Sequence, residues 1–382
     1  MRYRYSAGED GQLKKKAIIY TRDEHGINFA DVDIEAVNIV RRLKNAGYDT
    51  YIVGGAVRDL ILGKKPKDFD IVSSASPAKI KRIFRNARII GRRFRLVHIY
   101  FGPRIFEVAT FRSLKDGNTS NTFGVIDEDV FRRDFTMNAL FYDPEQQIVV
   151  DYTGGMEDIK KRLVKPVIPL AEIFTDDPVR MIRAVKYAAA ADFSLPFNVR
   201  QKIKSQSHLL SSISPSRLTE EIFKIVNSQR AAAIVDLLDK TGLYIYLQPQ
   251  AARLMRKNAS FRERYLQTMS GLSGAEKYRG QAIGSLFYDY LENTGSWESG
   301  VIENYKEIFQ MVRSFILPMN PPRFELEHSL RKFLSDHGIT IKRTHPKPVH
   351  EGADKPAAKR KRRRRKPKPA GQNPPHGNPS ST

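Results

Sequence analysis

Residues 54–70 read GGAVRDLILGKKPKDFD, a stretch that combines a glycine pair, an arginine and two closely spaced aspartates. It opens on Gly54-Gly55, continues into a helical segment that carries Arg58, and ends on Asp68 and Asp70. Glycines let backbone N–H groups approach a phosphate closely, and the start of a helix favours negative charge. Two aspartates spaced by one residue on a strand share a face and suit Mg²⁺. The stretch therefore predicts a site for a nucleoside triphosphate and the metal ions needed to attack it. Taken singly, however, each part is also compatible with a tight turn or with exposed turn aspartates.

The segments around this stretch alternate between helix and strand patterns. Apolar residues at three-residue spacing, followed by Gly47, predict a helix over 33–46, and Ser76-Pro77 predicts the start of another. Gly102-Pro103 separates two apolar runs and predicts a hairpin. The chain should therefore be mixed α/β up to about residue 155, with strands at 51–53, 68–72, 95–101, 104–111 and 146–152.

The pattern beyond residue 155 is helical. Helices are predicted over 177–190, 197–212, 216–228 and 230–240, with no convincing strand among them, and 251–340 is mostly helical but weakly patterned. We therefore expect a flexible lead-in and three folded regions, followed by a disordered basic tail. Their predicted bounds are 1–30 for the lead-in, 31–160 for an α+β head, 161–250 for a helical neck, 251–341 for a helical body and 342–382 for the tail.

The charge balance points to nucleic acid as a partner. Lys and Arg number 65 against 42 Asp and Glu, a net charge of +23. Residues 342–382 contribute +11 of this, and the Pro/Lys/Arg-rich composition there has little to bury, which predicts disorder. A general role in solubility or attraction to an anionic membrane is the alternative. Within the tail, the predicted RNA-binding residues are Lys359, Arg360, Lys361, Arg362, Arg363, Arg364 and Arg365.

Composition also excludes several classes of function. The chain has no cysteine, so disulfides, thiol chemistry and Cys-ligated zinc are ruled out. No apolar run approaches the ~20 residues of a membrane span, and the first 20 residues lack the apolar core of a secretory signal. These features are compatible with a reducing compartment, and we expect a cytoplasmic protein.

Three further segments carry candidate functional residues. Glu107 lies in an apolar strand, where a carboxylate is costly to bury unless it is paired or bound to metal, although an exposed edge strand would also tolerate it. Arg133 offers a planar fork to phosphate, and Asn138 can bond a sugar hydroxyl, although a helix start with a surface Arg-Asp pair is the simpler interpretation of this segment taken alone. Asp177 and Arg180 share a helix face and could read a base edge, unless they form only a helix cap and an ordinary ion pair.

Together these segments resemble the bacterial poly(A) polymerase and tRNA nucleotidyltransferase family, the class II branch of the polymerase β-like nucleotidyltransferases. The resemblance runs from about Tyr51 to Arg183, and Ser214–Glu221 looks like the family's neck helix. It implies that Asp68, Asp70 and Glu107 are catalytic and bind two Mg²⁺. It also implies a set of nucleotide-binding residues that hold the triphosphate, contact the ribose or select the base: Gly54, Gly55, Arg58, Arg133, Asp134, Asn138, Asp177, Arg180 and Arg183.

Family resemblance leaves two products open, a poly(A) tail on many RNAs or the CCA end of tRNA. Residues 89–98, IIGRRFRLVH, are similar to the stretch typical of the poly(A) polymerases, and Arg92 and Arg93 are predicted to contact RNA. We therefore expect transfer of AMP from ATP to the 3′ ends of mRNA, small RNA or tRNA, in RNA processing and decay, with the RNA-decay machinery as a possible partner. The alternatives are a CCA-adding enzyme and an inactive RNA-binding protein of the same fold.

Overall fold

The computed structural model describes residues 2–7, 13–91, 96–113, 124–271, 279–295, 297, 300–302 and 304–341. Its first half is built on one mixed sheet with strand order β1-β2-β9-β8-β3-β4-β7-β6-β5. All neighbouring strands are antiparallel except β4 and β7, which are parallel. The strands are β1 (Arg2–Ala7), β2 (Leu13–Tyr20), β3 (Thr50–Val53), β4 (Asp70–Ser73), β5 (Ala87–Ile90), β6 (Leu96–Phe101), β7 (Arg104–Thr110), β8 (Leu140–Asp143) and β9 (Ile148–Asp151).

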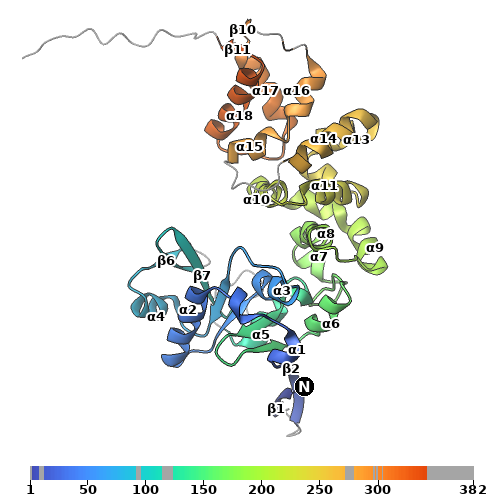
Figure 1. Ribbon diagram of the computed structural model, residues 1–382. Helices are drawn as coiled ribbons and strands as arrows, with labels where there is room; N and C mark the ends of the chain where they lie inside the picture. The colour runs from blue at the N-terminus through green and yellow to red at the C-terminus, as the bar shows by residue number, and fades with distance from the viewer. Residues whose placement is uncertain are drawn as a thin grey trace, which may run out of the picture. The chain divides into compact units, whose positions relative to one another are not determined.

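Helices cover both faces of this sheet (Figure 1). One face packs its buried side chains, such as Ile52 and Val108, with those of α2 and α4. The other face packs Val53 and Val72 with residues of α5, which leaves the ends of β3, β4 and β7 beside the candidate site. The helices of this half are α1 (Arg22–His25), η1 (Phe29–Asp31), α2 (Ile34–Asn45), α3 (Gly55–Ile61), α4 (Pro77–Ile83), α5 (Ile126–Phe131), η2 (Thr136–Asn138) and α6 (Gly155–Lys160).

Most of the predicted elements of this half are confirmed. The helix predicted over 33–46 is α2, with Asp33 as a cap that accepts from the backbone N–H of Glu35. The predicted hairpin is β6–β7, with Gly102 in the left-handed region at φ +58°. The prediction missed the short strands β5 and β8, whose pairing depends on distant neighbours.

The prediction of a flexible lead-in over residues 1–30 is wrong for the described residues, 2–7 and 13–30. β1 and β2 form a hairpin, and β2 adds to the edge strand β9 through the pairs Ile18–Asp151 and Tyr20–Val149. Ala17 and Tyr20 are buried. The segment is basic in sequence, but the open edge of β9 supplies a hydrogen-bonding partner that a local pattern cannot reveal.

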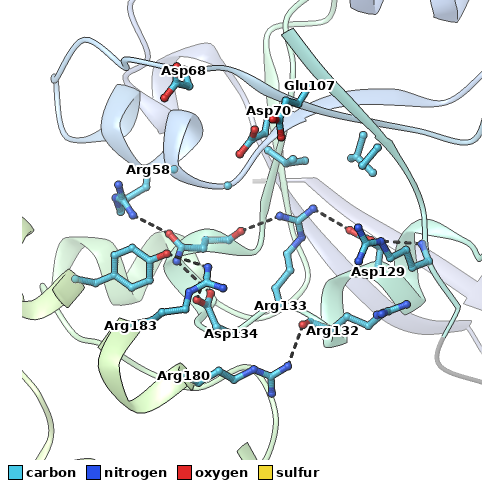
Figure 2. Close-up of a pocket in the computed structure, with 18 of the residues that line it drawn as sticks. Arg58, Asp68, Asp70, Glu107, Asp129, Arg132, Arg133, Asp134, Arg180 and Arg183 are labelled. Atoms are coloured by element: carbon cyan, nitrogen blue, oxygen red, sulfur yellow. Dashed lines mark hydrogen bonds and ion pairs between the residues drawn. The ribbon is translucent and has the colours of Figure 1, made fainter. Parts of the chain in front are cut away.

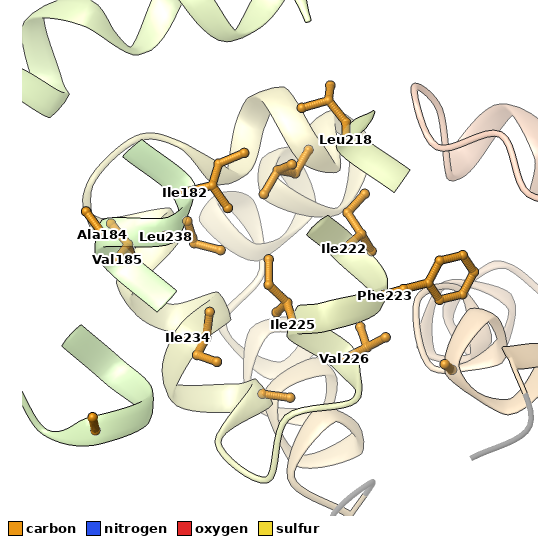
Figure 3. Close-up of a cluster of buried hydrophobic side chains, with 14 of the residues drawn as sticks. Ile182, Ala184, Val185, Leu218, Ile222, Phe223, Ile225, Val226, Ile234 and Leu238 are labelled. Atoms are coloured by element: carbon orange, nitrogen blue, oxygen red, sulfur yellow. The ribbon is translucent and has the colours of Figure 1, made fainter. Parts of the chain in front are cut away.

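The second half of the described chain is helical. Figure 3 shows α8, α10 and α11 packed through an apolar core that includes Ile182, Ile222 and Leu238. The predicted helices over 177–190, 216–228 and 230–240 correspond to these three, and the helix predicted over 197–212 is α9 followed by η3. The helices are α7 (Ile173–Asp176), α8 (Val179–Ala191), α9 (Phe197–Gln206), η3 (Ser207–Ser212), α10 (Pro215–Val226), α11 (Ala231–Lys240), α12 (Tyr244–Leu247), α13 (Pro249–Lys257), α14 (Ala259–Gly271), α15 (Arg279–Gly284), α16 (Tyr288–Thr294), α17 (Tyr305–Phe315) and α18 (Arg323–Asp336).

One small feature departs from the all-helical expectation for this half. β10 (Gly300–Ile302) and β11 (Ile339–Ile341) pair in parallel to form a separate two-stranded sheet. No helix within the described ranges is long and apolar enough to cross a membrane. The predicted tail, residues 342–382, lies outside the described residues, and the boundaries expected near residues 160 and 250 stay predictions.

His25 should make the stability of this half dependent on pH. Its buried ring donates from Nε2 to the carbonyl of Gln147 and accepts at Nδ1 from the N–H of Ile27, an arrangement that only neutral histidine can make. Burial lowers the pKa of His25 below its usual 6.5. The unfolded chain therefore takes up a proton first, and this contribution to stability should be lost as the pH falls below about 6.5. The measurement is urea unfolding at pH 7.5 and at pH 5. Between these two pH values the free energy of unfolding should fall more for the parent than for His25→Asn, and equal decreases would contradict the assignment.

Candidate active site

One cleft collects the candidate catalytic and nucleotide-binding residues. It has a volume of about 810 Å³ and lies between the ends of β3, β4 and β7, the helical turns α3 and η2, and the helices α8 and α10. Figure 2 shows Asp68, Asp70 and Glu107 on one side of the cleft and several arginines, with Asp129 and Asp134 among them, on the other. Twelve predicted residues line it: Gly54, Gly55, Arg58, Asp68, Asp70, Glu107, Arg133, Asp134, Asn138, Asp177, Arg180 and Arg183.

Asp70 and Glu107 form the acidic centre of the cleft. Ile71 of β4 is paired with Val108 of the parallel strand β7, so the residues just before them lie side by side on one face. Figure 2 shows their carboxylates next to each other. Burial raises the pKa of Asp70 above its usual value, and the negative charges of Glu107 and Asp68 raise it further, while Arg133 opposes the change. The fold therefore holds together two carboxylates that repel each other.

The position of Asp68 differs from the prediction. The strand expected over 68–72 begins only at Asp70, so Asp68 lies in the loop before it, and the shared-face argument does not apply to this pair. Among the described residues, no three acidic or histidine side chains stand close enough together to hold one metal ion. Asp70 and Glu107 therefore form the close pair, Asp68 lines the same cleft, and the binding of metal by all three carboxylates stays a prediction.

That close pair fits a divalent cation. Carboxylate oxygens are the ligands that Mg²⁺ prefers, and like charges held together favour a cation between them. His98, directly opposite Glu107 on β6, contacts it at 3.3 Å and is the partner found for this carboxylate. The donor set is therefore suited to Mg²⁺, with Glu107 half exposed toward the cleft.

The glycine turn precedes α3 at the end of β3. Gly54 has φ +73° and ψ −135°, a conformation that glycine adopts readily and other residues rarely do. A Cβ at this position would lie 3.8 Å from Oδ2 of Asp70, so the turn runs directly beside the acidic pair. Glycine is needed here for the backbone conformation rather than for lack of space.

A network of polar contacts joins α3, η2 and α8 across the floor of the cleft. Nη1 of Arg58 donates to Oδ1 of Asn138 at 2.9 Å, and Nδ2 of Asn138 donates to Oδ1 of Asp134 at 3.1 Å. The other oxygen of Asp134 forms an ion pair with Nη2 of Arg183 at 2.9 Å. Asp134 and Asn138 are buried, so the segment is not the surface helix start that would have been its simplest interpretation.

Arg133 lies between this network and the sheet. Its Nη2 donates to Asp129 at 2.8 Å, its Nη1 donates to the carbonyl of Asn138, and its guanidinium lies 4.9 Å from the ring centre of Phe141. The neighbouring Arg132 donates to the carbonyl of Ser113, and burial together with the positive charge of Arg112 lowers its pKa. These contacts hold a row of guanidinium groups along the wall that faces Asp70 (Figure 2).

The predicted side-by-side pair of Asp177 and Arg180 is not present. Nη1 of Arg180 pairs with Asp176 at 2.8 Å, and its Nη2 donates to the carbonyl of Arg132. Asp177 instead accepts from the N–H of Val179, the first residue of α8, and its second oxygen pairs with Arg217 of α10. The helix begins at Val179, so Asp177 precedes it and the helical spacing argument fails. Both residues still line the cleft.

Six charged or aromatic residues of the cleft were not among the predicted site residues. Two of them could have been found, because Lys186 and Tyr187 follow Arg183 by one helical turn and so share its face. The missed residues are Arg112, Asp129, Arg132, Lys186, Tyr187 and Lys224. The predicted RNA contacts Arg92 and Arg93, and those of the tail at residues 359–365, lie outside the described residues.

The fold and the cleft define the class: a polymerase β-like nucleotidyltransferase head followed by a helical region. Two family models match the chain, the poly A polymerase head domain over residues 50–165 and the probable RNA and SrmB-binding site of polymerase A over residues 192–255. Together they cover the cleft-forming strands and much of the helical neck. The chain belongs to the family of bacterial poly(A) polymerases and tRNA nucleotidyltransferases.

Individual relatives come from both branches of this family. Poly(A) polymerase I of Escherichia coli is 38% identical over 269 residues, 66% of this chain and 58% of the relative. The CCA-adding enzyme of Geobacillus kaustophilus is 38% identical over 238 residues, 60% of this chain and 58% of the relative. The solved structure of the Bacillus stearothermophilus CCA-adding enzyme in complex with CTP is 29% identical, with a TM-score of 0.57, over 79% of this chain and 82% of that one. The chain thus spans less than two thirds of the length of these two curated relatives.

Proposed function

We propose that the chain transfers AMP from ATP to the 3′ ends of RNA without a template, as a polynucleotide adenylyltransferase. The observation that carries this proposal is the paired carboxylates of Asp70 and Glu107, which face a cleft lined by arginines beside a glycine turn. Poly(A) polymerases and CCA-adding enzymes among the relatives support the reaction class.

The charges of the cleft support a requirement for divalent cations. Eight basic and six acidic side chains line it, and four of the arginines are paired with carboxylates inside the protein. The protein alone therefore offers little net positive charge to a triphosphate. Asp70 and Glu107 would hold two Mg²⁺ with Asp68 as a further ligand, and bound ions would activate the attacking hydroxyl and neutralise the leaving pyrophosphate.

The chain's own groups would bind and orient the two substrates. The glycine turn lets the triphosphate approach the backbone beside Asp70, and Arg58 with Arg133 would contact its oxygens. Asp134 and Asn138 would position the ribose. The RNA 3′-hydroxyl would release its proton to solvent, its oxygen would form a bond to the α-phosphorus in line with the leaving group, the α–β phosphoanhydride bond would break, and pyrophosphate would depart. Positioning and charge neutralisation supply most of the rate in such a reaction.

Base selection is assigned to the α8 end of the cleft. Asp177 and Arg180 line it there, and we propose that a bound adenine meets them, with the carboxylate accepting from the exocyclic amine. In the absence of nucleotide both side chains have protein partners, so selection would require these partners to be exchanged. The basic residues of the chain and of its tail would attract the RNA phosphates, and the affinity for RNA would depend on salt.

The second candidate is the addition of CCA to tRNA. The relatives of the two branches are equally identical to this chain, and a CCA-adding enzyme bound to CTP has the same fold. The match to the E. coli poly(A) polymerase covers more of the chain, 66% against 60%, which favours adenylation.

A single set of incubations tests the proposal. The protein is given an unstructured RNA primer, or a tRNA lacking its CCA end, with Mg²⁺ and each nucleotide separately or all four together. We expect a long run of A from ATP on either RNA and little addition from the other nucleotides. Addition of CCA followed by a halt, seen by sequencing the product ends, would establish the second candidate. No extension of either RNA would overturn both.

A further inference from the structure

Tyr187 occupies a central place in the cleft that the proposed reaction does not yet use. It lies on α8, one turn after Arg183, and lines the cleft. Its hydroxyl accepts from Nη2 of Arg183 at 3.0 Å. Its ring receives the guanidinium of Arg58 at 5.3 Å, and it packs edge-on against Phe135 at 6.0 Å.

These contacts close a ring across three elements. Arg58 of α3 bonds Asn138 of η2, Asn138 bonds Asp134, and Asp134 pairs with Arg183 of α8. Tyr187 joins the two ends, because its hydroxyl contacts Arg183 while its face contacts Arg58. Without Tyr187, Arg58 and Arg183 would be connected only through the hydrogen bond between Asn138 and Asp134.

We propose that Tyr187 is a positioning residue that holds Arg58 and Arg183 in the geometry that binds the incoming nucleotide. This inference rests on the proposed function and adds to it a coupling between the triphosphate side and the α8 side of the cleft. A guanidinium has many rotamers, and a partner that restricts it removes part of the entropy cost of binding. An aromatic face and a hydroxyl restrict two arginines at once.

Two substitutions separate the two contacts. Tyr187→Phe keeps the ring against Arg58 and removes only the acceptor for Arg183, so the KM for ATP should rise about fivefold, the effect of one lost hydrogen bond. Tyr187→Leu removes both contacts, and the KM should rise about thirtyfold. In both variants kcat should stay within about threefold of the parent, because the acidic pair is untouched.

Tyr244→Phe is the matched control. The hydroxyl of Tyr244 is hydrogen-bonded to that of Tyr265 at 2.8 Å, and both residues are buried in the helical second half of the described chain. This variant loses one tyrosine hydrogen bond outside the cleft, so it should lower the melting temperature and leave the KM for ATP unchanged. A merely structural role for Tyr187 would instead reduce the apparent kcat with the folded fraction and leave KM unaltered.

Direct binding separates this inference from the proposed function. The Kd for ATP in the presence of Mg²⁺ and without RNA is measured by calorimetry for the parent and the three variants. We expect it to follow the KM values, with Tyr187→Leu weakest and Tyr244→Phe like the parent. A Kd for Tyr187→Phe and Tyr187→Leu within twofold of the parent would overturn the role of Tyr187 even if the parent extends RNA. If the parent binds ATP but extends no RNA, and the Tyr187 variants bind ATP more weakly than the parent, the role of Tyr187 stands and only the proposed reaction is rejected.

Discussion

Replacing Asp70 by asparagine should abolish nucleotide addition and at the same time raise the stability of the fold. The amide would keep the shape of the side chain but lose the charge that a cation requires. Losing several kcal/mol of charge stabilisation in the transition state corresponds to a decrease in rate of about a thousandfold or more. The pKa of Asp70 is raised by burial and by Glu107, which means that its negative charge is unfavourable in the folded protein. Removing the charge relieves this cost at neutral pH.

The measurement pairs single-turnover extension of an RNA primer with thermal unfolding. Asp336→Asn is the control, because Asp336 is an exposed helix residue paired with Lys332 in the body, and it should change neither quantity appreciably. Activity of Asp70→Asn within tenfold of the parent would contradict the metal assignment. A lower melting temperature for that variant would show that the Asp70 carboxylate is a structural group instead.

Gly155→Ala should be the most damaging of the small substitutions near the site. A Cβ at Gly155 would lie 2.2 Å from the carbonyl oxygen of Thr136 and 3.2 Å from Leu140, so backbone atoms of η2 must move. Overpacking of this kind costs roughly 1–3 kcal/mol or more. Because η2 carries Asn138, the displacement should also disturb the bond from Arg58 and lower activity by about tenfold or more.

Gly154→Ala is the informative comparison for this variant. Gly154 has φ +83° with open space around its missing Cβ, so alanine there brings backbone strain of about 1–2 kcal/mol without a clash. Urea unfolding should rank the two variants with Gly155→Ala less stable, and only that variant should show reduced activity per folded molecule. The reverse order of stability would mean that the close packing of α6 on η2 is not maintained in solution.

The candidate site was largely predictable because its residues belong to short local patterns. The glycine turn, the helix with Arg58 and the strand with Glu107 each depend on neighbours within a few positions, and all twelve predicted cleft residues line one cavity. The errors occurred where a partner is distant in sequence or an element begins later than its pattern suggests. β2 forms by pairing with the edge strand β9, which is distant in sequence. Asp68 lies outside the strand that was expected to include it, and Arg180 forms its ion pair with Asp176 rather than with Asp177.

The sequence alone determined the helix and strand periodicity, the basic charge and the residue types of an acidic, arginine-lined nucleotide site, because these depend on side-chain chemistry and local spacing. The tertiary structure alone decided which groups meet. It placed Asp70 beside Glu107 through the parallel pairing of β4 with β7, and it brought Tyr187 against Arg58, which precedes it by more than a hundred residues. Such contacts arise from the register of a sheet and the docking of α8, which are set by packing over the whole fold and leave no local pattern to read.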